Sequence, residues 1–153
     1  MNNELLRHLL ATLSYRATQA ISDVPSDFPE LNIGKEVRTP IVILRHMSRV
    51  LTYAHSQFRP NDYGDSYEFP SGTWEWEVER FYRVLEKLDQ VLIESTTGDM
   101  TWQQLVQGPL SDAITHVGQL TLLRRLADSP VSYENFIKAD IRAGGRATSL
   151  PDK

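Results

Sequence analysis

Apolar residues recur at helical spacing in four long stretches of the chain. These stretches cover residues 4–21, 39–58, 73–95 and 109–127. Apolar positions three or four residues apart predict amphipathic α-helices, each with one face turned towards a common core. No stretch alternates polar and apolar residues as a half-buried strand does, and no internal repeat is present. The pattern therefore predicts an all-α protein built as a four-helix bundle.

Residue types at the ends of the predicted helices indicate where these helices begin and stop. Thr39 is a suitable N-cap, and Pro40 fits the first helical position, where no backbone N–H is needed. Gly98 is a natural stop for the third helix. Acidic residues in the first turns of that helix, Glu75, Glu77 and Glu79, favour the positive end of its dipole and are interpreted as helix chemistry rather than catalysis.

The connections complete a single domain over residues 1–153. Two prolines exclude a helix from the linker at 23–30, and we expect Phe28 and Leu31 to anchor this linker to the core. The polar and aromatic segment 59–72 is long enough to be a crossover loop, and it either covers a binding site or simply connects two helices. Short extra helices are predicted at 102–107 and 133–139, and Gly108-Pro109 between the former and the fourth long helix permits a bend or a restart.

Composition narrows the classes of function. The chain of 153 residues carries a net charge of −4, which gives no general attraction to nucleic acid or to anionic lipid. It contains no cysteine, so disulfides, thiolate metal ligands and a cysteine nucleophile are excluded. The N-terminus has no signal-peptide pattern, and no apolar run is long enough for a membrane span. We therefore expect a cytoplasmic protein that binds neither membranes nor nucleic acid directly.

The fourth long helix carries a polar stripe beside its apolar face. Asp112 and His116 are four residues apart and Gln119 follows three later, so they stack along one side of the helix. Leu123 falls within the same stripe, which predicts that the stripe faces the interior or a pocket beside it. A carboxylate and an imidazole out of water need partners. Either a shared metal ion or an ordinary Asp–His hydrogen bond satisfies them.

The second helix supplies a further histidine. His46 lies at the edge of the apolar face, and Tyr53 follows along the same stripe. His55 is nine residues after His46, on the opposite side of the helix, and we expect only His46 to border the core. If the second and fourth helices face one another, then His46, Asp112 and His116 form a set of two histidines and one carboxylate with open coordination positions.

Three segments carry a resemblance to a known family. They are Thr39-Pro40 at the start of a helix, LRHM at 44–47, and DAITHVGQL at 112–120 followed by Leu123-Arg124. Together they resemble the DinB/YfiT-like superfamily of four-helix-bundle metalloproteins, over nearly the whole chain. The resemblance implies that His46 and His116 are metal ligands. Where the family commonly has a third histidine, this chain has Asp112, which favours a harder ion.

The resemblance also implies a class of activity. Characterised members are divalent-metal-dependent enzymes that use low-molecular-weight thiols as S-transferases or isomerases, and others are proposed hydrolases. This chain is then expected to use nickel, zinc, iron or manganese on a small-molecule substrate, as an S-transferase or hydrolase. Because it has no cysteine, any thiol has to come from a cosubstrate. A homodimer through helix faces is a further expectation of the family.

The alternative is a non-catalytic bundle, a stress-related ligand-binding or interaction protein with a structural or vestigial metal site. The replacement of the usual histidine by Asp112 is consistent with it. In either case Gln119 and Tyr53 are candidates for the pocket around the ligands, with Trp76 as a further one. Arg124 and its neighbour Arg125 either bind an anionic substrate at the pocket mouth or form surface salt bridges.

Overall fold

The computed structural model describes residues 3–63 and 69–145, and within these ranges it is all-helical, without strands. Four long helices make up most of it, which confirms the predicted all-α class: α1 (Glu4–Ile21), α2 (Pro40–Phe58), α3 (Trp74–Glu94) and α5 (Ser111–Leu126). Shorter elements are the turns η1 (Phe28–Glu30) and η2 (Pro60–Asp62), the helix α4 (Trp102–Leu105) and the π-helical turn η3 (Val106–Leu110).

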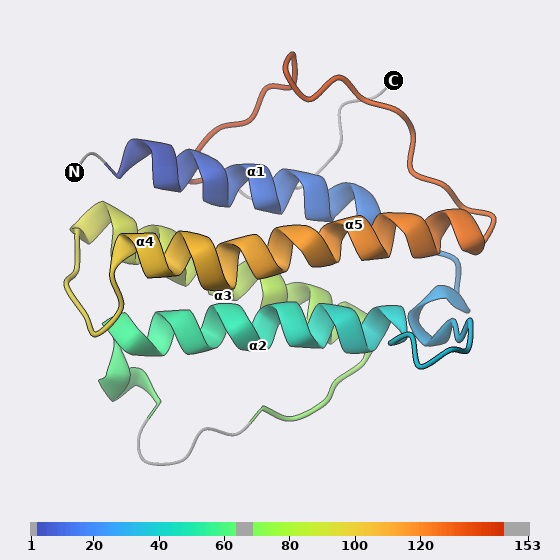
Figure 1. The fold of residues 1–153 in the computed structure, drawn as a ribbon, viewed down its shortest axis with the longest axis horizontal. Coiled ribbons are helices and arrows are strands. Elements are labelled where there is room, and N and C mark those ends of the chain that lie inside the picture. Colours follow the sequence, from blue (N-terminus) through green and yellow to red (C-terminus); the bar gives the residue numbers. More distant parts are fainter. Residues whose placement is uncertain (1–2, 64–68, 146–153) are drawn as a thin grey trace.

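The long helices lie side by side along one axis (Figure 1). α1 and α5 run in one direction, and α2 and α3 run in the other. Each long helix packs against two others, since α2 contacts α3 and α5 while α1 also contacts both of these helices. Because α2 and α3 are parallel neighbours, the end of α2 and the start of α3 lie at opposite ends of the bundle, which fits the predicted crossover, although residues 64–68 of that loop lie outside the described residues.

The apolar faces of the four helices meet in one core. Its largest fully buried side chains come from all the long helices, η1, α4 and η3: Leu13, Phe28, Ile43, Leu44, Met47, Leu51, Phe81, Leu88, Leu92, Leu105, Leu110 and Leu120. Phe28 is completely buried and Leu31 packs against the core, so the predicted anchoring of the linker is confirmed. No described helix is both long and apolar enough to cross a membrane.

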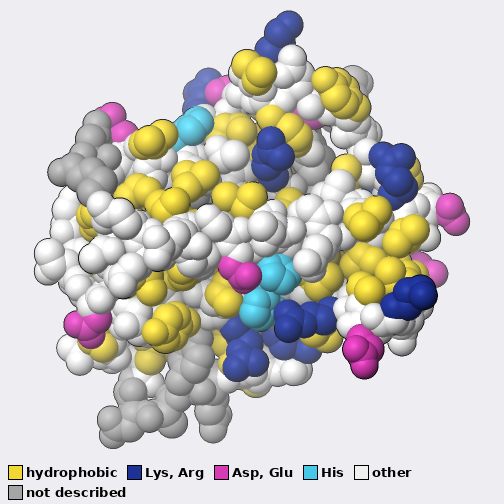
Figure 2. Space-filling model, viewed as in Figure 1, with side chains coloured by type: hydrophobic (Ala, Val, Ile, Leu, Met, Phe, Trp, Pro, Cys, Tyr) yellow, Lys and Arg dark blue, Asp and Glu magenta, His cyan; other side chains and the backbone are white. Residues whose placement is uncertain are grey.

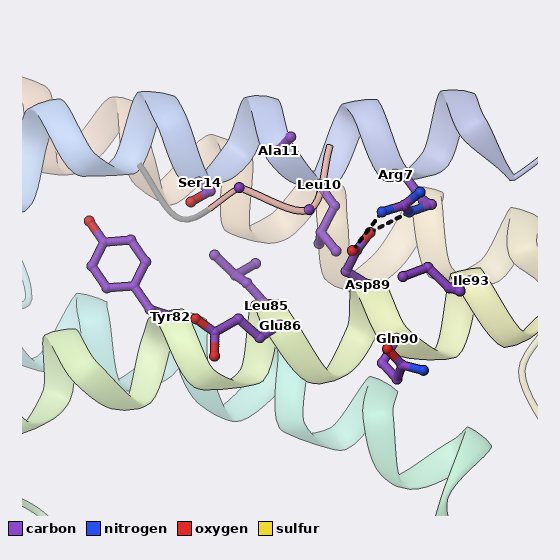
Figure 3. A pocket seen from close by; sticks show the side chains of 12 residues that line it. Arg7, Leu10, Ala11, Ser14, Tyr82, Leu85, Glu86, Asp89, Gln90 and Ile93 are labelled. Carbon is purple, nitrogen blue, oxygen red and sulfur yellow. Dashed lines mark hydrogen bonds and ion pairs between the residues drawn. The ribbon is translucent and has the colours of Figure 1, made fainter. Parts of the chain in front are cut away.

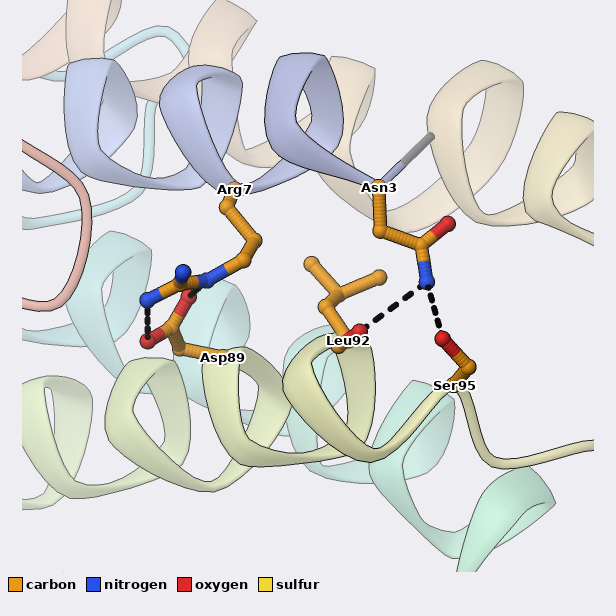
Figure 4. Close-up of polar contacts among 5 residues, drawn as sticks. All are labelled: Asn3, Arg7, Asp89, Leu92 and Ser95. Carbon is orange, nitrogen blue, oxygen red and sulfur yellow. Dashed lines mark hydrogen bonds and ion pairs between the residues drawn. The ribbon is translucent and has the colours of Figure 1, made fainter. Parts of the chain in front are cut away.

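Polar contacts fix the start of α1 against the end of α3 (Figure 4). Arg7 donates two hydrogen bonds to the Asp89 carboxylate, at 2.7 and 2.9 Å. One turn earlier, the Asn3 amide donates to the Leu92 carbonyl at 2.9 Å and to the Ser95 hydroxyl at 3.2 Å. These contacts tie together two helices whose sequences are far apart.

The helix ends differ in part from the prediction. Thr39 occupies the N-cap position of α2, but its side chain makes no capping hydrogen bond. The prediction that Gly98 stops α3 was wrong, because the helix ends at Glu94 and the next residue, Ser95, caps it in the left-handed conformation (φ 51°). Gly98 serves close packing instead, since a Cβ there would lie 2.3 Å from the Gln57 carbonyl oxygen.

The chain from Trp102 to Leu126 stays helical through Gly108-Pro109, without a restart. It begins with a capping box, in which Thr101 and Gln104 exchange side-chain and backbone hydrogen bonds. The wider π-helical turn η3 accommodates Pro109, which lacks a backbone donor. The Ser111 hydroxyl donates to the Val106 carbonyl across this turn at 2.6 Å.

The predicted short helix at 133–139 was wrong, because these residues form irregular turns over α1. Tyr133 and Ile137 are 91% and 96% exposed, so the segment has no buried apolar face to hold a helix in place. It is anchored by the Phe136 ring, which packs edge-on against the Tyr15 ring of α1, and by polar contacts. The carboxylate of Glu134 accepts hydrogen bonds from the Tyr15 hydroxyl and the Gln19 amide of α1.

Candidate metal centre

The structure brings the three predicted ligands together. His46 of α2 faces Asp112 and His116 of α5, and one ligand atom from each lies within 4.8 Å of the others. The His46 Nε2 atom is 3.1 Å from the Asp112 Oδ2 atom, and the His116 Nδ1 atom is 3.6 Å from the same oxygen. Among the residues that the structure describes, this is the one cluster of three or more potential metal ligands.

Local geometry on α5 and the packing of α2 against α5 place these groups. Asp112 and His116 are one helical turn apart and therefore lie on the same side of α5. The π-helical turn η3 ends directly before α5, and it changes the helical phase between the buried residues Leu105 and Leu110. Such turns are frequent at functional sites. His46 reaches the pair because α2 and α5 are neighbours in the bundle.

The imidazole of His116 is oriented by its own helix. Its Nδ1 atom lies 2.7 Å from the backbone carbonyl oxygen of Asp112. An N–H at Nδ1 donates to this carbonyl, which leaves the lone pair of Nε2 available to a metal ion. A backbone carbonyl that fixes the tautomer in this way is a usual partner of a metal-ligating histidine. The donor set of two imidazoles and one carboxylate thus fits a divalent cation.

The site is open to solvent on one side. His116 is buried, whereas the side chains of His46 and Asp112 keep 32% and 40% of their surface exposed. Figure 2 shows histidine and acidic side chains next to one another on this face, with cationic side chains close by. The prediction that the polar stripe of α5 faces a pocket is confirmed, and Leu123 within the stripe is buried.

A pocket of about 600 Å³ adjoins the triad. Gln119 lines it, as predicted, and so does part of the linker before α2, which the sequence did not indicate. Tyr53 is 55% exposed and is not among the lining residues, so the structure does not bring it to the site. Trp76 lines a different pocket, where it stacks on the Arg80 guanidinium.

Arg124 has a structural role that neither sequence-based interpretation anticipated. It is buried, and its guanidinium donates to the backbone carbonyls of Ala20, Ser22 and Ser129 at 3.1, 2.9 and 2.8 Å. Burial lowers the pKa of Arg124. Arg124 therefore joins the end of α5 to the end of α1 and takes no part in the pocket.

The expectation that only His46 borders the core was wrong. His55 is 3% exposed, and its Nδ1 atom lies 2.7 Å from the Tyr63 hydroxyl. Burial lowers the pKa of His55, and the nearby charge of Lys87 lowers it further. The chain turns back after α2, so residues beyond the helix cover a side that helical periodicity alone assigns to solvent.

Glu77 does more than stabilise the positive end of the α3 dipole. It is fully buried, and its Oε1 atom accepts hydrogen bonds from Arg45 Nε at 3.0 Å and from the Gly72 backbone N–H at 2.9 Å. This ion pair joins α2 to α3 one residue before His46. It supports the position of the triad without contacting it.

A second pocket, of about 580 Å³, lies between α1 and α3 (Figure 3). Its side chains include the paired Arg7 and Asp89 and the apolar Leu10, Leu85 and Ile93. Although its volume is nearly the same, its described lining residues contain no cluster of three metal ligands. Volume does not distinguish the two pockets, whereas the donor set does.

Comparison of the chain with protein-family models, with curated proteins and with solved structures gives no match.

Proposed function

We propose that this protein is a divalent-metal-dependent enzyme that acts on a small molecule, of the S-transferase or hydrolase type found in the DinB/YfiT-like superfamily. The observation that carries the proposal is the cluster of His46, Asp112 and His116, with ligand atoms within 4.8 Å of one another beside an open pocket. The motif resemblance around these residues supports the assignment to the superfamily.

Three protein ligands leave coordination positions for water or substrate, which is typical of catalytic rather than structural metal sites. Nickel, zinc, iron and manganese all accept imidazole and carboxylate ligands. When bound, such an ion supplies Lewis acidity, which lowers the pKa of a thiol or water ligand or polarises an electrophile. A low-molecular-weight thiol is the expected cosubstrate, because the chain has no cysteine of its own.

The residues of the chain have separate tasks in this proposal. The Asp112 carbonyl holds His116 through Nδ1, so the orientation of the His116 imidazole is fixed before any ligand arrives. Asp112 supplies the single negative charge of the triad. Gln119 lines the pocket without a hydrogen-bond partner among the described residues, and its amide is available to orient a ligand. The buried walls of α2 and α5 exclude water from the inner side of the site.

Elemental analysis of protein purified without a polyhistidine tag tests the proposal. We expect one equivalent of a divalent metal in the wild type and its loss in both His46→Ala and Asp112→Ala. His8→Ala is the matched control, because His8 is exposed on α1 and lies outside the triad. A wild type that contains no metal and refuses added zinc and nickel would refute the metal centre and favour the non-catalytic bundle.

A further inference from the structure

The segment 32–38 forms part of the pocket wall in an unusual conformation. Three consecutive residues, Gly34, Lys35 and Glu36, have φ angles of 77°, 56° and 60°. The left-handed region is unfavourable for residues other than glycine, and such residues cluster at functional sites. Two hydrogen bonds hold the turn, from Gly34 N–H to the Asn32 side chain at 2.8 Å and from Val37 N–H to the Gly34 carbonyl at 3.1 Å.

This turn presents apolar side chains to the pocket. Ile33 and Val37 line it while remaining 39% and 42% exposed, and Leu122 of α5 lines it at 57% exposed. These side chains contribute little to the core. A ligand with an apolar body would cover them, which is the usual way in which a pocket of this size binds a small molecule.

The same turn also presents two charges. Arg38 and Glu36 both line the pocket, and neither makes an ion pair within the described part of the chain. Their formal charges are opposite, so together they add nothing to the net charge of the pocket. The remaining formal charge is then that of the triad: the Asp112 carboxylate alone is negative, whereas with a divalent cation and two neutral imidazoles the triad carries one positive charge.

We propose that the pocket takes a small organic anion with an apolar body, with the anionic group beside Arg38 and the apolar part against Ile33, Val37 and Leu122. Metal loading reverses the sign of the pocket's charge, so the anion binds to the metal-loaded protein and only weakly to the metal-free one. The inference rests on the proposed function, because it needs the metal, and it adds the chemical class of the substrate.

Isothermal titration calorimetry of zinc-loaded protein tests it with two probes, ω-mercaptohexanoate and its uncharged analogue ω-mercaptohexanol. We expect the acid to bind about fivefold more tightly than the alcohol, as a partly exposed charge contact allows. Arg38→Gln removes this preference, and Glu36→Gln increases it, because it removes a repelling charge. Lys35→Gln is the matched control: it makes the same change in charge as Arg38→Gln at a neighbouring residue that does not line the pocket.

A fourth variant separates the apolar contact from the charge. Leu122→Gln weakens both probes to a similar extent and leaves the preference for the acid unchanged. Equal binding of acid and alcohol to the wild type, a preference that survives in Arg38→Gln, or equally tight binding of the acid to metal-free protein would each overturn the inference. Zinc is measured on every sample: a failure with full zinc content refutes the substrate class alone, whereas a wild type without zinc refutes the metal centre as well.

Discussion

Two histidines of α2, His46 and His55, lie on opposite sides of the helix and in opposite environments. His55 is almost completely buried, and its Nδ1 atom contacts the Tyr63 hydroxyl. His46 is partly exposed and shares a site with the carboxylate of Asp112 and the imidazole of His116. Burial thus indicates that His55 is a packing residue, whereas the two further potential ligands beside His46 indicate that it is a candidate metal ligand.

The difference follows from the solvation of each imidazole. His55 is held neutral, since burial and the charge of Lys87 lower its pKa, and it stabilises the end of α2. The His46 imidazole faces a negative carboxylate beside open solvent, an arrangement that attracts cations. The comparison therefore predicts that changes at the triad alter metal binding, whereas changes at His55 alter stability.

The largest expected effect is stabilisation by metal. At zinc concentrations about a hundredfold above the dissociation constant, the wild type gains about 3 kcal/mol of stability. For a chain of this length, that raises Tm by roughly 6–12 °C. His116→Ala loses this rise in Tm, because only two of the three metal ligands remain. His55→Ala keeps the rise, because His55 is not a ligand. Differential scanning fluorimetry with zinc and with chelator measures both, and an equal rise in wild type and His116→Ala would contradict the ligand assignment.

The second effect is on intrinsic stability. His55→Ala leaves a cavity at a buried position and removes the hydrogen bond to the Tyr63 hydroxyl, so we expect it to lower the free energy of unfolding by about 2 kcal/mol. Tyr63→Phe removes the hydrogen bond alone and costs about 1 kcal/mol. Urea denaturation in the presence of chelator measures both values. The metal content of both variants stays at that of the wild type, and a loss of metal in either would break the comparison.

A smaller effect appears in the pH dependence of stability. The pKa of His55 is lowered in the folded protein. Below the ordinary value of 6.5, His55 is therefore protonated in the unfolded chain while it is still neutral in the folded chain. The contribution of His55 is therefore complete above 6.5 and is lost as the pH falls through its folded pKa. His55→Gln shows a shallower decline than wild type in urea denaturation across this range. Parallel curves would contradict the role assigned to burial.

The smallest effect concerns the edge of the triad pocket. Gln119 lines the pocket without a hydrogen bond to another described residue, so we expect Gln119→Ala to weaken zinc binding by less than about tenfold, the lower end of what orienting residues contribute. Tyr53→Ala, at an exposed position outside the lining, leaves the zinc affinity unchanged. Competition with a chromophoric chelator measures both. A larger loss in Tyr53→Ala than in Gln119→Ala would reverse this assignment.

Sequence periodicity predicted the long helices well, because each repeats buried residues at a constant local spacing. Most of the wrong predictions involve contacts between residues that are distant in sequence. Segment 133–139 has helical spacing but lies exposed over α1. Gly98 packs against Gln57 instead of ending a helix. Arg124 and Glu77, charged residues that a local pattern assigns to the surface, are buried because carbonyls or an opposite charge from other elements satisfy them.

The sequence by itself determined the helices and the pairing of Asp112 with His116, since a separation of four residues places two side chains on one side of any α-helix. Its motifs also singled out His46. Only the tertiary structure decided that α2 packs beside α5, that the turn at 32–38 adds Arg38 to the pocket, and that His55 is covered. Helical periodicity is a local property, whereas neighbours in a bundle depend on packing summed over the whole chain.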